Sequence, residues 1–203
     1  MESRTARCGI AIALFFTLCS FQACQTHTNR AIHQTEELTI TLREMPAGYP
    51  SLEPYDHPYA LQPQKISSML ESLDYEARSP LPFSRGRQYH VFTEHQGRFL
   101  GSALSKALSL ALPQEVVAFS VADQEKPDRR TKGLVFVLSD ELHLIIEELH
   151  KPVYQGEGTT YQQQTPRWEL LPGDNQRHYA SRPGGKGAIT NWLITPIREG
   201  IIE

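Results

Sequence analysis

The chain has 203 residues, of which 39% are hydrophobic and 21% are charged, and its formal net charge is −3. This composition excludes an intrinsically disordered chain, which combines low hydrophobicity with high net charge, and it predicts one folded domain of ordinary size. Lysine and arginine form no basic stripe along the sequence, so we expect no nucleic acid among the partners.

The first 23 residues have the order of a secretory signal peptide. Arg4 and Arg7 precede an apolar run that extends from Cys8 to Ala23. This run has the length of a signal-peptide hydrophobic region and is shorter than the roughly 20 residues that span a bilayer. Residues 1–23 are therefore predicted to be a signal peptide that is removed from the mature protein.

The residues at the end of this segment, Phe21-Gln22-Ala23-Cys24, resemble the lipobox of bacterial lipoproteins. The match covers the signal only, and it departs from the usual pattern in its Phe and Gln. The resemblance implies cleavage before Cys24, lipid on its sulfur and amine, and anchoring of the protein to a membrane. Ordinary secretion and an uncleaved anchor are the alternatives. Gln25 after the cysteine implies sorting to the outer membrane, facing the periplasm, over the inner membrane.

All three cysteines, Cys8, Cys19 and Cys24, lie within the first 24 residues. The body that follows has no thiol for a disulfide or a thiolate metal site, which suits an oxidising compartment. We expect no cofactor and no metal.

Beyond the cysteine, residues 24–36 are predicted to be a lipidated, flexible tether with a reach of about 20 Å, and residues 37–203 a single domain. Leu38, Ile40 and Leu42 alternate with threonines, which predicts a half-buried strand. A loop rich in proline and tyrosine follows, from residue 45 to residue 61.

Two segments have the periodicity of amphipathic helices. The first begins at Pro63, which suits a first helical turn, and the second follows Thr93 and Gln96, whose spacing fits a capping box. Pro113 ends the second. Their apolar residues are Ile66, Met69, Leu70 and Leu73 in the first and Leu100, Ala103, Leu104, Ala107, Leu108 and Ala111 in the second. We expect both stripes to pack on a sheet, because the second helix lacks the dense basic face of membrane-surface helices.

The second half of the chain predicts strands. Residues 115–123 form one, residues 124–132 a charged loop, and residues 133–138 and 142–149 a hairpin. The first hairpin strand is apolar on both faces, so we expect it to lie centrally, and the second to be more exposed. Two apolar islands, residues 168–171 and 188–197, are predicted to close the sheet. The fold class is therefore α+β, with two helices packed on a mainly antiparallel sheet.

Few residues are candidates for chemistry. His57 could act as a general acid or base, although turn formation and aromatic packing explain its surroundings equally well. His143, Glu147, Glu148 and His150 are the densest group of potential metal ligands. On a strand, His143 and Glu147 would share a face, but the spacing matches no zinc signature, and a solvated strand face is the favoured interpretation.

Two further features have simpler explanations than a binding site. Residues 183–187 (PGGKG) lack the Ser or Thr that follows the lysine of a phosphate loop, and a strand-like run comes next, so a surface turn is favoured. The aromatic residues Trp168, Trp192, Tyr49, Tyr55 and Tyr59 could form a binding patch, but filling of the core is favoured.

The leading hypothesis is a non-enzymatic envelope lipoprotein that binds a protein or polymer of the envelope or supports assembly of a complex. The first alternative is a periplasmic hydrolase that uses His57 or the pair His143 and Glu147. The second is a small-ligand-binding module that uses the aromatic loops. A shared cleft around the three candidate residues would favour the hydrolase, whereas separate placement would oppose it.

Overall fold

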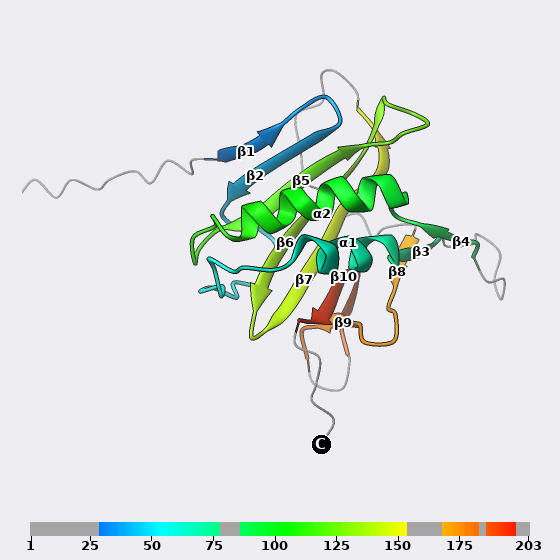
Figure 1. Cartoon of the computed structure of the whole chain (residues 1–203). Helices are drawn as coiled ribbons and strands as arrows, with labels where there is room; N and C mark the ends of the chain where they lie inside the picture. Colours follow the sequence, from blue (N-terminus) through cyan, green and yellow to red (C-terminus); the bar gives the residue numbers. More distant parts are fainter. Residues whose placement is uncertain (1–28, 78–85, 154–167, 183–185, 198–203) are drawn as a thin grey trace, which may run out of the picture.

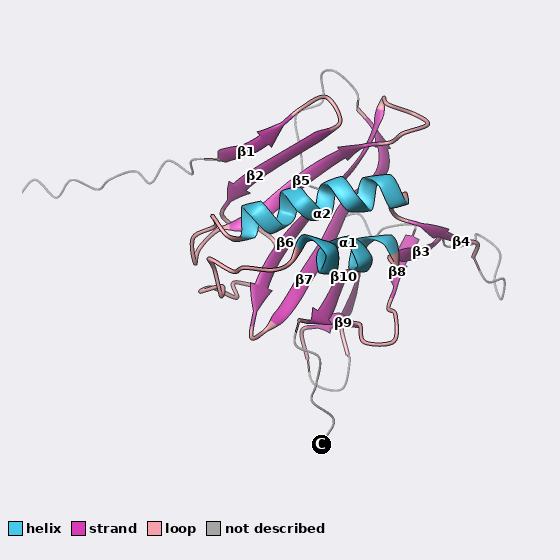
Figure 2. Ribbon diagram, viewed as in Figure 1, coloured by secondary structure: helices cyan, strands magenta, loops and turns pink. Residues whose placement is uncertain are grey.

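The computed structural model describes residues 29–77, 86–153, 168–182 and 186–197. In these ranges two helices lie on one face of a seven-stranded sheet, and a second sheet of three strands stands beside them (Figures 1 and 2). The architecture confirms the predicted α+β class. Neither described helix is long and apolar enough to cross a membrane. Cys24 and the predicted signal peptide lie outside the described residues, so both stay predictions.

The large sheet is antiparallel throughout and has the strand order β1-β2-β5-β6-β7-β10-β9. The predicted central position of the first hairpin strand is confirmed, because β6 has three strands on either side. The strands are β1 (Arg30–Gln34), β2 (Leu38–Arg43), β5 (Val116–Ala122), β6 (Arg129–Leu138), β7 (Glu141–Pro152), β9 (Arg177–Ala180) and β10 (Ala188–Pro196).

The predicted tether is too long at its C-terminal end. Residues 30–34 form β1, which pairs with β2 at the edge of the sheet. Only Ile32 of this strand is half-buried, and it packs against the core. A polar, mostly exposed edge strand has no apolar alternation, so its sequence resembles a linker, and the hydrogen bonds to β2 are what order it.

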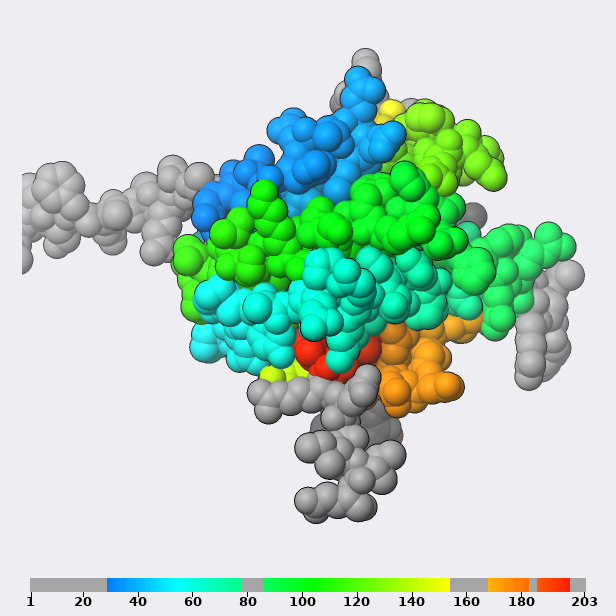
Figure 3. All heavy atoms as spheres, viewed as in Figure 1, coloured from blue at the N-terminus to red at the C-terminus, as the bar shows by residue number. Residues whose placement is uncertain are grey.

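Both predicted helices are present. Helix α1 covers Pro63–Glu71 with its proline in the first turn, and α2 covers Glu94–Leu108. The capping box is complete: the backbone N–H of Gln96 donates to Thr93 Oγ1 at 3.2 Å, and the backbone N–H of Thr93 donates to Gln96 Oε1 at 2.9 Å. The helices pack side by side over the sheet (Figure 3). Gly101 allows this close approach, since a Cβ there would collide with Ser67 of α1.

The second sheet consists of β3 (Asp74–Ala77), β4 (Gln88–His90) and β8 (Trp168–Leu171), with β3 in the centre. The prediction that residues 168–171 close the large sheet is therefore wrong, although residues 188–197 do so as β10. The sequence analysis did not predict strands β3 and β4, because four and three residues are too few to establish a period.

The large sheet has a hydrophobic core on each face. The helix-side core lies under α1 and α2, and the loop-side core lies under the loop of residues 45–61. The helix-side core contains Ile40, Leu42, Ile66, Leu70, Leu100, Leu104, Leu108, Val135 and Ile146 among others. The loop-side core contains Tyr55, Val116, Ala118, Leu134, Phe136, Ile145, Trp192 and Ile194, with Met45, Tyr49, Leu52, Leu138, Tyr179 and Ile189 packed around it.

The second hairpin strand, which was expected to be the more exposed of the two, is largely buried in its first half. Residues 142–146 of β7 are buried, including His143 at 4% and Ile145 at 0% relative exposure. Strand β10 pairs along the outer edge of β7, and the loop-side core covers the face that carries His143. Alternation of apolar and polar residues indicates that the polar face of a strand is exposed only when no other element covers that face. Here an irregular loop covers it.

Candidate functional site

His57 is buried, at 5% relative exposure, and both of its ring nitrogens are occupied. Nδ1 lies 2.9 Å from the carbonyl oxygen of Glu115, and the backbone N–H of Val137 donates to Nε2 at 3.1 Å. The pairing of β5 with β6 ends at Val117 and Val135, and the same register extended by two residues would place Glu115 opposite Val137. The imidazole therefore takes the place of a direct backbone hydrogen bond between Glu115 and Val137.

These contacts decide the protonation state of His57. A carbonyl can only accept and an N–H can only donate, so Nδ1 carries the proton and Nε2 holds a lone pair that is already used. Burial lowers the pKa of His57 below its ordinary value, against the opposing effect of the Glu115 carbonyl. His57 is a neutral structural bridge and has no free nitrogen for acid or base catalysis.

His143 belongs to the loop-side core, where its ring stacks on Phe136 with centroids 4.7 Å apart. The indole N–H of Trp192 donates to its Nδ1 at 3.2 Å. Burial lowers the pKa of His143 to about 4, so the ring is neutral at pH 7. With Nδ1 accepting, the proton lies on Nε2, and the ring can donate a hydrogen bond but cannot act as a base.

Glu147 shares the loop side of β7 with His143, as predicted, but the two side chains have different partners. Glu147 Oε2 accepts from Arg43 of β2 at 3.3 Å. Burial raises the pKa of Glu147, and the Arg43 charge and a hydrogen bond from Tyr49 oppose that rise. The pair His143 and Glu147 therefore does not form an acid–base couple.

The remaining members of the predicted metal-ligand group are separated as well. Glu148 pairs with Lys132 at 2.8 Å and with Lys151 at 3.0 Å, and His150 pairs with Asp123 at 2.9 Å. Within the described part of the chain, no group of three or more histidine, cysteine or acidic side chains is placed to hold a metal ion. Each of these side chains already has an ionic partner of its own.

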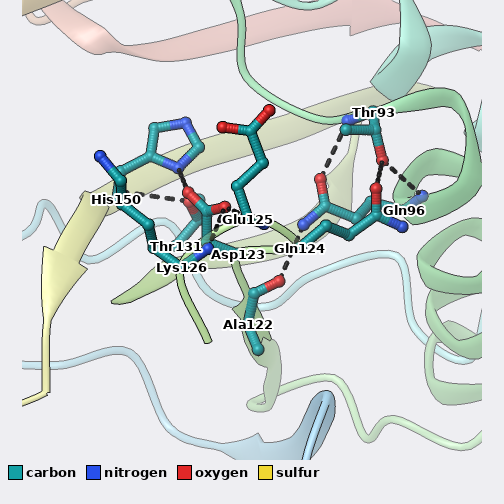
Figure 4. Close-up of polar contacts among 9 residues, drawn as sticks. All are labelled: Thr93, Gln96, Ala122, Asp123, Gln124, Glu125, Lys126, Thr131 and His150. Atoms are coloured by element: carbon teal, nitrogen blue, oxygen red, sulfur yellow. Dashed lines mark hydrogen bonds and ion pairs between the residues drawn. The ribbon is translucent and has the colours of Figure 1, made fainter. Parts of the chain in front are cut away.

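The His150–Asp123 pair belongs to a polar cluster at the start of α2 (Figure 4). Burial raises the pKa of Asp123, but backbone N–H groups of Glu125 and Lys126 and the His150 ring outweigh it, so the net shift is downward. Beside it, Gln96 Nε2 donates to the carbonyl of Ala122 at 2.8 Å. The contact between residues 123 and 150 was not predicted from the sequence, because it is the sheet that brings them together. The cluster fastens α2 to the end of β5.

The predicted aromatic residues mainly fill the core. Tyr55 is 3% exposed and Trp192 is 0% exposed, and Tyr49 packs edge-on against Trp192 with centroids 6.1 Å apart. Trp168 of β8 packs edge-on against Tyr75 in the second sheet. The expectation of core filling is therefore confirmed for these residues.

Residues 183–185 of the predicted surface turn lie outside the described residues. Lys186 and Gly187 form a turn, Gly187 has a φ of 74°, and β10 starts at the next residue. A phosphate loop requires a helix at that point, because the N–H groups at its first turn bind the phosphate. A strand cannot supply them.

One groove opens on the loop side of the sheet and has a volume of about 620 Å³. Strands β6, β7, β9 and β10 supply its wall, together with Leu52 and other residues outside the strands. Tyr179 lines it and stacks on Trp192 with centroids 4.0 Å apart and an angle of 12° between the rings. His143 also reaches the groove, from the loop-side core.

Two arginines line the same groove. Arg177 donates twice to Glu141, with both distances 2.7 Å, and this bidentate contact lowers the pKa of Glu141. Arg182 lines the groove as a second cation. The groove therefore combines an aromatic wall with hydrogen-bond donors. Sequence reasoning missed it, because its residues come from four strands and from loop residues such as Leu52 that only the sheet topology brings together.

Comparison of the chain with protein families, with curated proteins and with solved structures gave no match.

Proposed function

We propose that this protein is a lipid-anchored component of the bacterial cell envelope whose domain binds another envelope component, a protein or a polymer, without catalysing a reaction. The lipobox-like residues that end in Cys24 support the anchor. Gln25 in the following position supports the outer membrane, facing the periplasm, as its location.

The observation that carries the binding role is the contrast between the histidines and the groove. His57 and His143 are neutral and committed to contacts inside the fold. The groove beside them offers aromatic and apolar walls and two arginines, of which Arg177 is paired with Glu141. Such a surface recognises an apolar or aromatic group that carries hydrogen-bond acceptors, which is a binding function.

A site-specific photocrosslinker tests this role in membranes of the native organism. A crosslinker at Ala180, in the groove, should capture one defined partner, and a crosslinker at Arg98, on the exposed face of α2, should not. Arg182→Glu should abolish capture, because it reverses a charge in the groove. Equal capture from both positions, or none from either, would contradict the proposal.

The anchor has its own test. Cys24→Ala should block processing, prevent incorporation of labelled palmitate and move the protein from the detergent phase to the aqueous phase. Normal maturation of this variant would exclude the lipoprotein assignment.

A small-ligand-binding module is the second candidate, because about 620 Å³ lies within the usual range of about 300–1,000 Å³ for ligand sites. A ligand that copurifies with the protein and is lost in Arg182→Glu would favour it over a macromolecular partner. The hydrolase alternative has less support, because His57, His143 and Glu147 do not meet in a shared cleft.

A further inference from the structure

The turn between α2 and β5 exposes two leucines that flank a buried alanine. Leu110 and Leu112 are each 46% exposed, whereas Ala111 between them is 1% exposed. Among the described residues, the other exposed large hydrophobic side chains are Tyr89 and Val153, in two separate places. This turn is therefore the one place in the described chain where two of them lie together.

The turn is joined to the first strand of the domain by Arg30. Its guanidinium donates to the carbonyl oxygen of Leu110 at 2.9 Å and to both carboxylate oxygens of Glu115, at 3.2 and 2.8 Å. The same carboxylate accepts from the backbone N–H of Leu112 at 2.9 Å. The start of β1 and the turn are thus held together at one end of the molecule (Figure 1).

Chain length then places this end close to any membrane that holds Cys24. Six residue steps separate Cys24 from Arg30, which span at most about 20 Å when fully extended. The exposed residues of the turn carry no charge, and Lys106 lies in the last turn of α2 beside them. Exposed leucines with a nearby cation suit the boundary between headgroups and acyl chains.

We propose that the turn of residues 109–114 is the membrane-facing surface of the domain, with Leu110 and Leu112 inserted into the lipid surface. This inference rests on the proposed lipid anchor. It also gives the domain an orientation, with the turn toward the lipid and the groove on the loop side of the sheet.

The processed, lipidated protein in vesicles tests this orientation. Its predicted mature body has no cysteine besides Cys24, so Leu112→Cys and Tyr89→Cys each give one site for a fluorescent dye. Tyr89 lies in β4, at the far end of the molecule in Figure 1, and serves as the matched control. Lipids with nitroxide groups on their acyl chains should remove most of the fluorescence at residue 112 and leave that at residue 89 unchanged.

The other outcomes distinguish a failure of the proposed orientation from a failure of the proposed lipid anchor. Protein that floats with vesicles but shows equal quenching at both positions would overturn the orientation and leave the anchor intact. Protein that takes up no palmitate and does not float would overturn both. A third outcome is energy transfer between dyes at residue 112 that persists in detergent, with no quenching by lipid. It would show that the leucines contact a second copy of the chain, and it would also overturn the inference.

Discussion

The two faces of the large sheet are covered in different ways. Two helices cover one face, and the core beneath them is built mainly from aliphatic side chains. An irregular loop covers the other, and the core beneath it contains Trp192, Phe136 and Tyr55 together with the buried histidines. Both cores exclude water, but only the loop-side core contains buried titratable groups in contact with its aromatic rings.

Backbone hydrogen bonding explains the difference. A helix satisfies its own N–H and C=O groups, so it needs to present only an apolar stripe to the sheet. The loop must find partners elsewhere: the N–H of Tyr55 donates to the carbonyl of Pro113, that of Asp56 to Val137 and that of Tyr59 to Leu108. The side chain of His57 adds two further hydrogen bonds between the loop and the rest of the fold. A loop can therefore cover a sheet only if polar groups are buried with it.

The largest effect is expected from truncating the largest side chain of the loop-side core. Trp192→Ala should lower the free energy of unfolding by about 3–5 kcal/mol, because it leaves a cavity and removes the donor to His143. Leu104→Ala, under the helices, is the matched control and should cost about 2–5 kcal/mol. Denaturant titration measures both. Only the Trp192 variant should change the pH dependence of stability, and an unchanged dependence would show that the two cores behave alike.

Acid should destabilise the domain through the loop-side core. The folded pKa of His143 is about 4 and its unfolded pKa is about 6.5, so its contribution to stability is complete above pH 6.5 and is lost as the pH falls to about 4. The difference amounts to about 3 kcal/mol. His57 shifts in the same direction, and Glu147, whose pKa is raised, works against it.

His143→Asn is the control for this prediction, because its side-chain oxygen can accept from Trp192 and does not titrate. Unfolding titrations between pH 7 and pH 4 should show a shallower slope for the variant. An identical slope would exclude His143 as the source.

Removing the bridging imidazole should cost less than removing the indole. His57→Ala leaves the Val137 N–H and the Glu115 carbonyl without their partner, which should cost about 1–3 kcal/mol. Hydrogen exchange should show faster exchange at Val137 than in the parent. Full protection of that amide would mean that β5 and β6 close the rung directly and that the bridge is dispensable.

The smallest effect is expected at Tyr55. Among the described residues its buried hydroxyl has no hydrogen-bond partner, and burial raises its pKa to about 12. Tyr55→Phe should therefore be neutral or should stabilise the protein by up to about 1 kcal/mol. A thermal melt measures the change, and a clear loss of stability would reveal a partner for the hydroxyl.

Local features were predictable where neighbouring residues carry the signal. The capping box at Thr93 and Gln96 and the apolar stripe after it identify α2 without any tertiary contact. The hairpin of β6 and β7 was likewise indicated by its β-branched residues and its turn. Strand β1 was missed, because its order comes from pairing with β2 and not from its own composition.

The candidate site was predicted only in part. The shared face of His143 and Glu147 followed from the two-residue period of a strand. Their partners, Trp192 and Arg43, could not be inferred, because each lies on a strand whose place in the sheet depends on topology. The groove and the contact of Arg30 with the turn of residues 109–114 could not be inferred for the same reason, because both depend on the topology of the sheet.

The sequence by itself determined the predicted export signal, the α+β class and the presence of the main helices and strands, since each depends on residues close together in the chain. Their limits were less accurate: residues 129–132, predicted to belong to a charged loop, form the start of β6 because they pair with β5 and β7. Tertiary structure alone decided what the histidines do. His57, a residue that can serve in acid–base catalysis, has a structural role here because its neutral imidazole satisfies a carbonyl of Glu115 and an N–H of Val137 that β5 and β6 leave unpaired.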